Sequence, residues 1–407
     1  MLKIRFQEIL KYFLVIGAGV LAFWKLSIFR PFSVNYPPSV PYKTLTYRNH
    51  QPDTILAAPG GHFAQNRLGE FFLGKHYRFY WETPIKAPVL DLQTEAGGLF
   101  VAKRGGGMQT TSFTILDKDS IVYTLRSVDK DPISVIPPFL WPTVFGSFVR
   151  DQISATDPYA LRPVLYLTAL AGIADTEAKL VFVRKDDPAF KKFNLPANGF
   201  YYLSKKPEVP VADSGMATLG GRFYASPAML ASLARNPGFR IDTMAYLKCR
   251  LFDLYIGDWD RHAGQWDWLG FKAQNDTVFK PIPKDRDQAF GYYSDGVFPF
   301  LLSCNFAVRK ITSFKPEFDD IPGFSQNGSD LDARFLKPLP EKAFIQMARE
   351  LQHALPENEL RNAVALYPKP VRGFAQKHLL PALVARREKL PAAAREFAQT
   401  IKQHANQ

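Results

Sequence analysis

The densest group of chemically active side chains lies in IGDWDRHAGQW, residues 256–266. Asp258, Asp260, Arg261, His262 and Gln265 follow one another there with few residues between them. A bare cluster of carboxylates repels itself unless a cation relieves it, and hard divalent cations prefer carboxylate and amide oxygens as ligands. The segment therefore predicts a charged site that includes a bound cation.

A second acidic segment, IPKDRDQAFG, places Asp285 twenty positions after Gln265 and Asp287 two positions later. It directly follows VFKPIP, which is typical of a short buried strand. Because each acidic segment comes at the end of an apolar element, we expect the two to face one another and share a metal ion.

An apolar helix must carry the first acidic segment. Met244, Leu247, Leu251 and Leu254 recur at spacings of three and four, which predicts one buried helical face. Gly257 then ends the helix, because glycine adopts the left-handed conformation that closes a helix without strain. Trp259, Trp266 and Trp268 are expected to pack around the loop that follows.

Further upstream, a glycine-rich turn separates two strand candidates. The turn is KRGGGMQT, and the next strand, VYTLRSV, carries Arg126. Taken alone, the glycines fit an ordinary hairpin and Arg126 fits a solvated charge. The order is nevertheless that of protein kinases, in which a glycine-rich loop covers the ATP phosphates and a cation follows on the next strand. Kinases also carry H-R-D-x-x-x-x-N, and Asp260 and Gln265 have the spacing of its Asp and Asn.

Five segments together resemble a known family: IGDWDRHAGQW, IPKDRDQAF, GGGMQTTS, LRSVDKDP and RDQISATDPYA. They are similar to atypical kinases of the secreted Fam20 type, the spore-coat CotH type and the bacterial HipA type. The similarity is greatest to an uncharacterised bacterial group with this kinase-like domain, and it covers about residues 69–401.

The resemblance implies ATP with Mg²⁺ or Mn²⁺ as cofactors. It implies nucleotide-binding roles for Gly105, Gly106, Gly107, Gln109, Arg126 and Asp151, with Asp151 as the acidic partner of Arg126. Asp260 is expected to be the catalytic base. The expected metal ligands are Gln265, Asp285 and Asp287.

The expected fold is α+β, with the two lobes of a protein kinase: a β-rich lobe over residues 69–207 and a mainly helical lobe over 208–407. A membrane anchor or signal segment is expected over 1–29, followed by a Pro-rich linker and N-terminal extension over 30–68. The basis is YFLVIGAGVLAFW, residues 12–24, which has no charge and is extended by LSIF after Lys25. A spanning helix needs about 20 apolar residues, so an anchor, a cleaved signal and a buried helix all stay open.

An anchor is the favoured interpretation, and the charges around it weakly favour a body outside a bacterial inner membrane. The net charge of +13 suits nucleotide phosphates or anionic lipid. It is dispersed and no nucleic-acid module is recognised, so nucleic acid is not an expected partner. The two cysteines, Cys249 and Cys304, provide no zinc ligand set, and the sequence does not say whether they pair.

The function expected is a membrane-anchored phosphotransferase acting on a hydroxyl group of a protein, a glycan or a lipid headgroup. Two alternatives stay open. One is a pseudokinase or ligand-binding module, which the Arg in place of Lys at 126 and the pair Lys205 and Lys206 at the lobe junction favour. The other is a metal-dependent phosphoester hydrolase.

Overall fold

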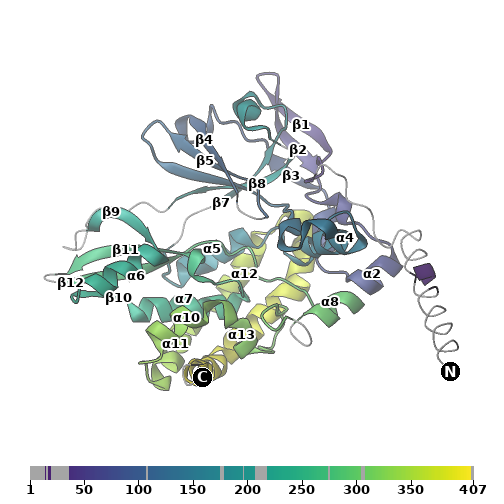
Figure 1. Cartoon of the computed structure of the whole chain (residues 1–407). Helices are drawn as coiled ribbons and strands as arrows, with labels where there is room; N and C mark the ends of the chain where they lie inside the picture. The colour runs from purple at the N-terminus through teal and green to yellow at the C-terminus, as the bar shows by residue number, and fades with distance from the viewer. Residues whose placement is uncertain are drawn as a thin grey trace, which may run out of the picture.

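The computed structural model describes residues 36–106, 109–174, 178–195, 197–206, 218–273, 276–303 and 308–404, together with residues 14 and 17–19. The chain forms a mixed fold of β-sheets and many helices, with strands gathered in its first part and helices in its last (Figure 1). The anchor predicted over 1–29 lies outside the described residues except at those four positions. Within the described ranges, no helix is long and apolar enough to cross a membrane.

The largest sheet has five antiparallel strands in the order β4-β5-β6-β8-β7. They are β4 (Leu99–Gly105), β5 (Ser112–Asp117), β6 (Val122–Ser127), β7 (Ala178–Val183) and β8 (Gly199–Lys205). Phe113 of β5 and Leu125 of β6 are paired and fully buried on one face. Side chains alternate along a strand, so Arg126 is directed to the opposite face.

Helices lie between the third and fourth strands of this sheet in chain order. They are α4 (Val144–Asp151) and α5 (Leu161–Leu170). Gly172 follows the end of α5 and has a positive φ of 64°. The sequence did not predict the three-stranded sheet that precedes: β1 (Tyr42–Arg48), β2 (Gln51–Ala57) and β3 (Ile85–Pro88). The short helices α2 (Arg67–Leu73) and α3 (Arg78–Glu82) join β2 to β3.

The second part of the chain adds a four-stranded sheet in the order β10-β12-β11-β9. Its strands are β9 (Thr218–Ala225), β10 (Phe239–Ile241), β11 (Trp266–Ala273) and β12 (Asp276–Pro283). β11 and β12 form a hairpin directly after the first acidic segment. Trp266 and Trp268 of β11 are fully buried, so they pack around the loop as predicted, but from a strand that the sequence did not predict.

Helix α7 (Thr243–Ile256) runs through the main core and is the helix predicted from the apolar spacing. Leu247, Leu251 and Leu254 are buried, whereas Met244 is exposed at the helix start. The helices that pack against it are α10 (Ser329–Leu336), α11 (Glu341–Ala354) and α13 (Lys369–His404), and α12 (Glu357–Ala365) packs against α13. Together they hold the end of α7 rigidly in the interior.

A close backbone approach at α4 gives a stability prediction. A Cβ atom on Gly146 would lie 2.3 Å from the carbonyl oxygen of Trp141, whereas one on Gly373 in α13 would meet nothing within 4 Å. Gly146→Ala is expected to destabilise the protein by about 1–3 kcal/mol through overpacking. Gly373→Ala is expected to stabilise it by about 0.5–1 kcal/mol, because alanine favours a helix interior. Urea unfolding of the two variants measures both, and equal effects would contradict the packing described.

Candidate active site

The first acidic segment begins where α7 ends. Gly257 adopts a left-handed conformation with φ of 73°, as predicted, and the loop 258–265 follows it. Asp258 is buried and accepts a hydrogen bond from Arg261 at 2.7 Å. Burial raises the pKa of Asp258 to about 7, although the charge of Arg261 opposes the shift. The carboxylate of Asp258 therefore has a structural role inside the loop.

Arg261 connects this loop to two neighbouring segments, α7 and the turn after β12. Its buried guanidinium donates to Asp253 of α7 at 2.9 and 3.1 Å. It also donates to the carbonyl oxygens of Gln265, at 3.2 Å, and of Lys284. The amide of Lys284 donates back to the carbonyl of Gln265 at 2.9 Å. The two acidic segments are thus fixed side by side, as the sequence predicted, and Lys284 directly precedes Asp285.

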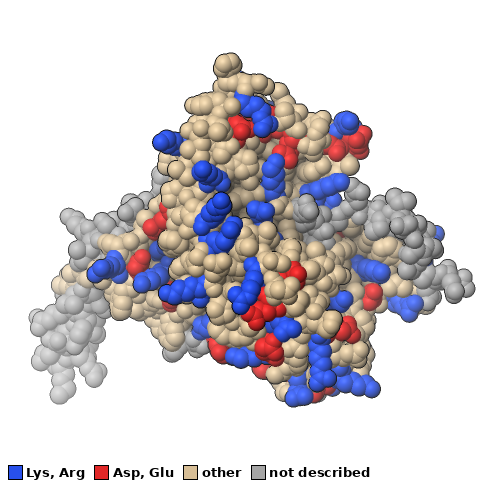
Figure 2. All heavy atoms as spheres, turned by 180° about the vertical axis from the view of Figure 1, so that it is seen from behind, with Lys and Arg blue, Asp and Glu red and all other residues tan. Residues whose placement is uncertain are grey.

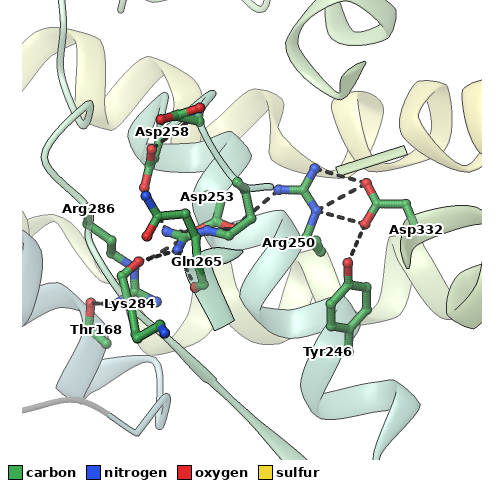
Figure 3. A network of polar contacts seen from close by, with 11 residues as sticks. Thr168, Tyr246, Arg250, Asp253, Asp258, Gln265, Lys284, Arg286 and Asp332 are labelled. Carbon is green, nitrogen blue, oxygen red and sulfur yellow. Dashed lines mark hydrogen bonds and ion pairs between the residues drawn. The ribbon is translucent and has the colours of Figure 1, made fainter. Parts of the chain in front are cut away.

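A second layer of charge holds α7 itself (Figure 3). Arg250 of α7 donates to both oxygens of Asp332 in α10, at 2.8 and 2.9 Å, and to Asp253 at 3.3 Å. The hydroxyl of Tyr246 donates to Asp332 at 2.8 Å. These groups are buried, and a buried charge is tolerated when it is paired and hydrogen-bonded. The network therefore fixes the helix from which the loop departs.

Asp260 is half-buried in the loop and accepts a hydrogen bond from Nδ2 of Asn327 at 2.6 Å. Burial raises its pKa, and the charge of Asp287 acts in the same direction. Gln265 is also half-buried. His262 steadies the loop by accepting a hydrogen bond from the amide of Gly264 at 3.0 Å.

Ion pairs join the second acidic segment to the large sheet. Nη2 of Arg126 in β6 lies 2.5 Å from Oδ2 of Asp285, and the ammonium of Lys130 pairs with Asp287. Burial and the charge of Asp287 raise the pKa of Asp285. Burial acts on Asp287 too, but the charges of Lys130 and Arg126 outweigh it and lower the pKa of Asp287. Asp287 is thus ionised at neutral pH.

These pairs lie at a cavity of about 230 Å³. The large sheet contributes Arg126 and Lys130 to its lining, and the segment after β12 contributes Asp285 and Asp287. Its other basic lining residues are Lys205, Lys206, Lys284 and Arg286. Elsewhere the charges are mixed: Figure 2 shows Lys and Arg spread over one face of the molecule with Asp and Glu between them. The cavity instead combines these cations with four carboxylates, those of Asp157, Asp267, Asp285 and Asp287.

The predicted site residues fall into three groups in the structure. Arg126, Asp285 and Asp287 meet at the cavity, and Asp260 and Gln265 lie in the neighbouring loop but do not line it. The glycine-rich turn joins β4 to β5, with Gly105 and Gly106 exposed and Gly106 at a φ of 120°. Gln109 is exposed and its carbonyl accepts from the amide of Asp131 at 2.8 Å. Gly107 lies outside the described residues.

Asp151 has a different partner from the one expected. Its two carboxylate oxygens accept hydrogen bonds from Arg78 at 2.9 and 2.6 Å, and both side chains are about 2% exposed. Arg126 pairs with Asp285 instead. The physical reason is position: α3 brings the guanidinium of Arg78 to the end of α4, where it contacts the carboxylate twice, whereas Arg126 lies at Asp285. The pairing of Asp151 with Arg126 was therefore wrong.

Two contributors to the site were missed in the sequence. Arg78 is the one charged residue in the aromatic run YRFYW, and a lone charge in such a run indicates a buried ion pair. Asn327 lies 67 positions from Asp260, and its segment carries no motif that indicates this contact. Lys130, which the sequence offered beside Lys103 as an alternative to Arg126 for contact with ATP, follows β6 and pairs with Asp287.

Among the described residues, no group of three or more His, Cys, Asp and Glu side chains is placed to hold a metal ion. Cys249 is buried and unpaired, and burial raises the pKa of its thiol to about 12. Cys304 lies outside the described residues.

No family model and no curated protein matches the chain. A solved structure of a Helicobacter pylori proinflammatory kinase, CtkA, is similar over 77% of this chain and 99% of that chain, with 12% identity and a TM-score of 0.38. A Golgi casein kinase is similar over 75% of this chain and 73% of that chain, with 10% identity and a TM-score of 0.29. Scores this low do not carry a conclusion about chemistry, which must come from the contacts above.

The buried pair of Arg78 and Asp151 predicts a large loss of stability when one partner is removed. Arg78→Met leaves the carboxylate of Asp151 buried without its counter-charge, which is expected to cost about 3–5 kcal/mol. Arg361→Met is the matched control, because its partner Glu357 lies one helical turn away on an exposed surface. Such a pair contributes about 0.3–0.5 kcal/mol. Denaturant unfolding measures both, and a loss below 1 kcal/mol for Arg78→Met would contradict the assignment.

Proposed function

We propose that the chain is a kinase-like phosphotransferase that binds a nucleoside triphosphate with a divalent cation in the cavity beneath the large sheet. The observation that supports this most is the pair of contacts across the cavity, Arg126 with Asp285 and Lys130 with Asp287. Kinases need a cation from the third strand of the first sheet and a metal-binding aspartate after a later strand. β6 is the third strand of the large sheet in chain order, and Asp285 directly follows β12.

The residues at the cavity fit both parts of such a ligand. Arg126, Lys130 and Lys284 offer donors to phosphate oxygens, and Asp285 and Asp287 offer the oxygen ligands that Mg²⁺ prefers. Proteins usually bind Mg²⁺ through one or two carboxylates together with phosphates of the substrate. Two carboxylates on one turn therefore suffice, with the amide of Gln265 as a further ligand from the neighbouring loop.

Asp260 is placed to act on the acceptor. Its pKa is raised by burial, which makes the carboxylate a better proton acceptor, and Asn327 fixes its orientation. The bound nucleotide would supply the terminal phosphoryl group, whose bond to the bridging oxygen breaks as a bond to the acceptor oxygen forms. Asp260 takes the hydroxyl proton. The acceptor class, a hydroxyl on a protein, glycan or lipid headgroup, belongs to the same proposal.

A catalytically inactive ligand-binding module is the second candidate. Both acidic side chains already form ion pairs, Asp285 with Arg126 and Asp287 with Lys130. This favours the inactive module, because a metal ion has to displace both basic side chains before it can bind. An arginine also differs from the usual lysine in shape, because its planar fork keeps a fixed geometry. This candidate predicts nucleotide binding without turnover.

ADP formation from Mg·ATP by the full chain tests the proposal, because it registers transfer to any acceptor, including water. We expect Asp260→Asn to lower turnover by about 10²–10⁴-fold, the usual contribution of a positioned acid or base, while the affinity for nucleotide changes little. Asp186→Asn is the matched control on an exposed side chain and should leave turnover unchanged. Binding without turnover in the unmodified chain would favour the inactive module. Turnover that survives in Asp260→Asn would contradict the assigned base.

A further inference from the structure

Three short helices away from the cavity share a small hydrophobic core. They are α2, α4 and α8 (Val297–Leu302), which lie near one another in Figure 1. Leu73 and Phe148 are buried between them, with Phe72 and Phe298 packed alongside. This core is separate from the main one, so the outer surfaces of the three helices form a distinct part of the molecule.

The outer surface of this unit is unusually apolar. Its exposed side chains are Phe71, Phe139, Phe145, Phe300, Leu301 and Leu302, which we call the apolar face. Phe139, in the turn before α4, is 75% exposed and Phe71 is 62% exposed. Single exposed apolar residues are ordinary, but a contiguous group of them marks an interaction site.

Ring contacts link the helices that carry the apolar face. Exposed Phe71 contacts Phe72, with ring centroids 5.0 Å apart, and Phe72 stacks on Phe298 at 5.6 Å. Phe298 in turn contacts Phe148 at 6.2 Å, and Phe148 contacts exposed Phe145 at 6.4 Å. The turn that carries Phe139 packs against α4 at Gly146. One set of touching rings therefore links the three helices from surface to surface.

The N-terminal segment joins the body beside this face. Tyr36 donates a hydrogen bond to Asp129 at 2.6 Å, and the guanidinium of Arg150 in α4 lies 5.1 Å from the centre of its ring. The uncharged stretches 12–24 and 26–29 end seven positions before Tyr36. Seven extended residues span at most about 25 Å, so whatever holds the end of this segment at residue 29 must also lie near α4.

We propose that the apolar face rests on the surface of a lipid bilayer, the same bilayer into which residues 12–29 are predicted to insert. Phenylalanine and leucine side chains on such a surface enter the boundary between headgroups and acyl chains. Arg67 and Lys75, exposed at the two ends of α2, then lie at the level of anionic headgroups. The docked face fixes the orientation of the body relative to the bilayer, and this inference does not depend on the proposed phosphotransfer.

Site-specific fluorescence on the full chain tests the proposal. An environment-sensitive label is attached to F139C, and in a matched control to K118C, in the exposed turn between β5 and β6. Both are built on C304S so that the introduced thiol is labelled, since Cys249 is buried. The chain is reconstituted in vesicles of phosphatidylcholine and phosphatidylglycerol. Quenching is then measured with doxyl-labelled lipid and with aqueous iodide.

We expect doxyl lipid to quench the label at 139 at least twice as strongly as the label at 118, and iodide to show the reverse order. Strong iodide quenching at both positions with no effect of doxyl lipid would overturn the proposal. So would shielding of position 139 from both quenchers, because that result means that protein covers the face. The double variant F71E and F300E, both at exposed positions, should reduce doxyl quenching at 139 without lowering the melting temperature.

Discussion

The guanidinium of Arg261 is the group on which the geometry of the site depends. It is buried, and it binds carboxylates of Asp253 and Asp258 and the carbonyl oxygens of Gln265 and Lys284. Those partners come from the core helix, the loop after it and the turn after β12. One planar, permanently charged group with five donors can join three segments in a way that a lysine cannot. The distance between Asp260 and the second acidic segment is set by this contact.

The large sheet is tied to that framework by charge across the cavity. Arg126 and Lys130 each hold one carboxylate of the acidic turn, and Asp287 also accepts a hydrogen bond from Nε2 of Gln288 at 2.9 Å. Asp285 keeps a positive φ of 50°, a conformation that is uncommon for a residue with a side chain and is often retained at functional sites. A phosphate group with its cation is chemically able to exchange with both pairs at once, since phosphate suits the basic residues and the cation suits the acidic ones.

Local sequence patterns predicted several helices and strands, whereas the pairing of side chains at the site depends on ion pairs between residues far apart in the chain. The spacing of Leu247, Leu251 and Leu254 and the position of Gly257 predicted α7 and its end, because helix periodicity and glycine caps are local properties. Arg78 is the contrary case. The residues near Arg78 in the chain do not indicate that Asp151 would pair with it and not with Arg126. The partner of Asp151 depends on how α3 packs against α4. The strand β11 was missed for a related reason, since buried tryptophans fit a strand or a loop equally well.

We propose that Asp285 and Asp287 exchange their basic partners for a metal ion when nucleotide binds. Calorimetric titration of the full chain with ATP, with and without Mg²⁺, measures this exchange, with the double variant D285N/D287N alongside. We expect Mg²⁺ to strengthen ATP binding at least tenfold in the unmodified chain, and we expect the variant to lose this gain while still binding ATP alone through Arg126 and Lys130. ATP binding that ignores Mg²⁺, or a gain that persists in the variant, would contradict it.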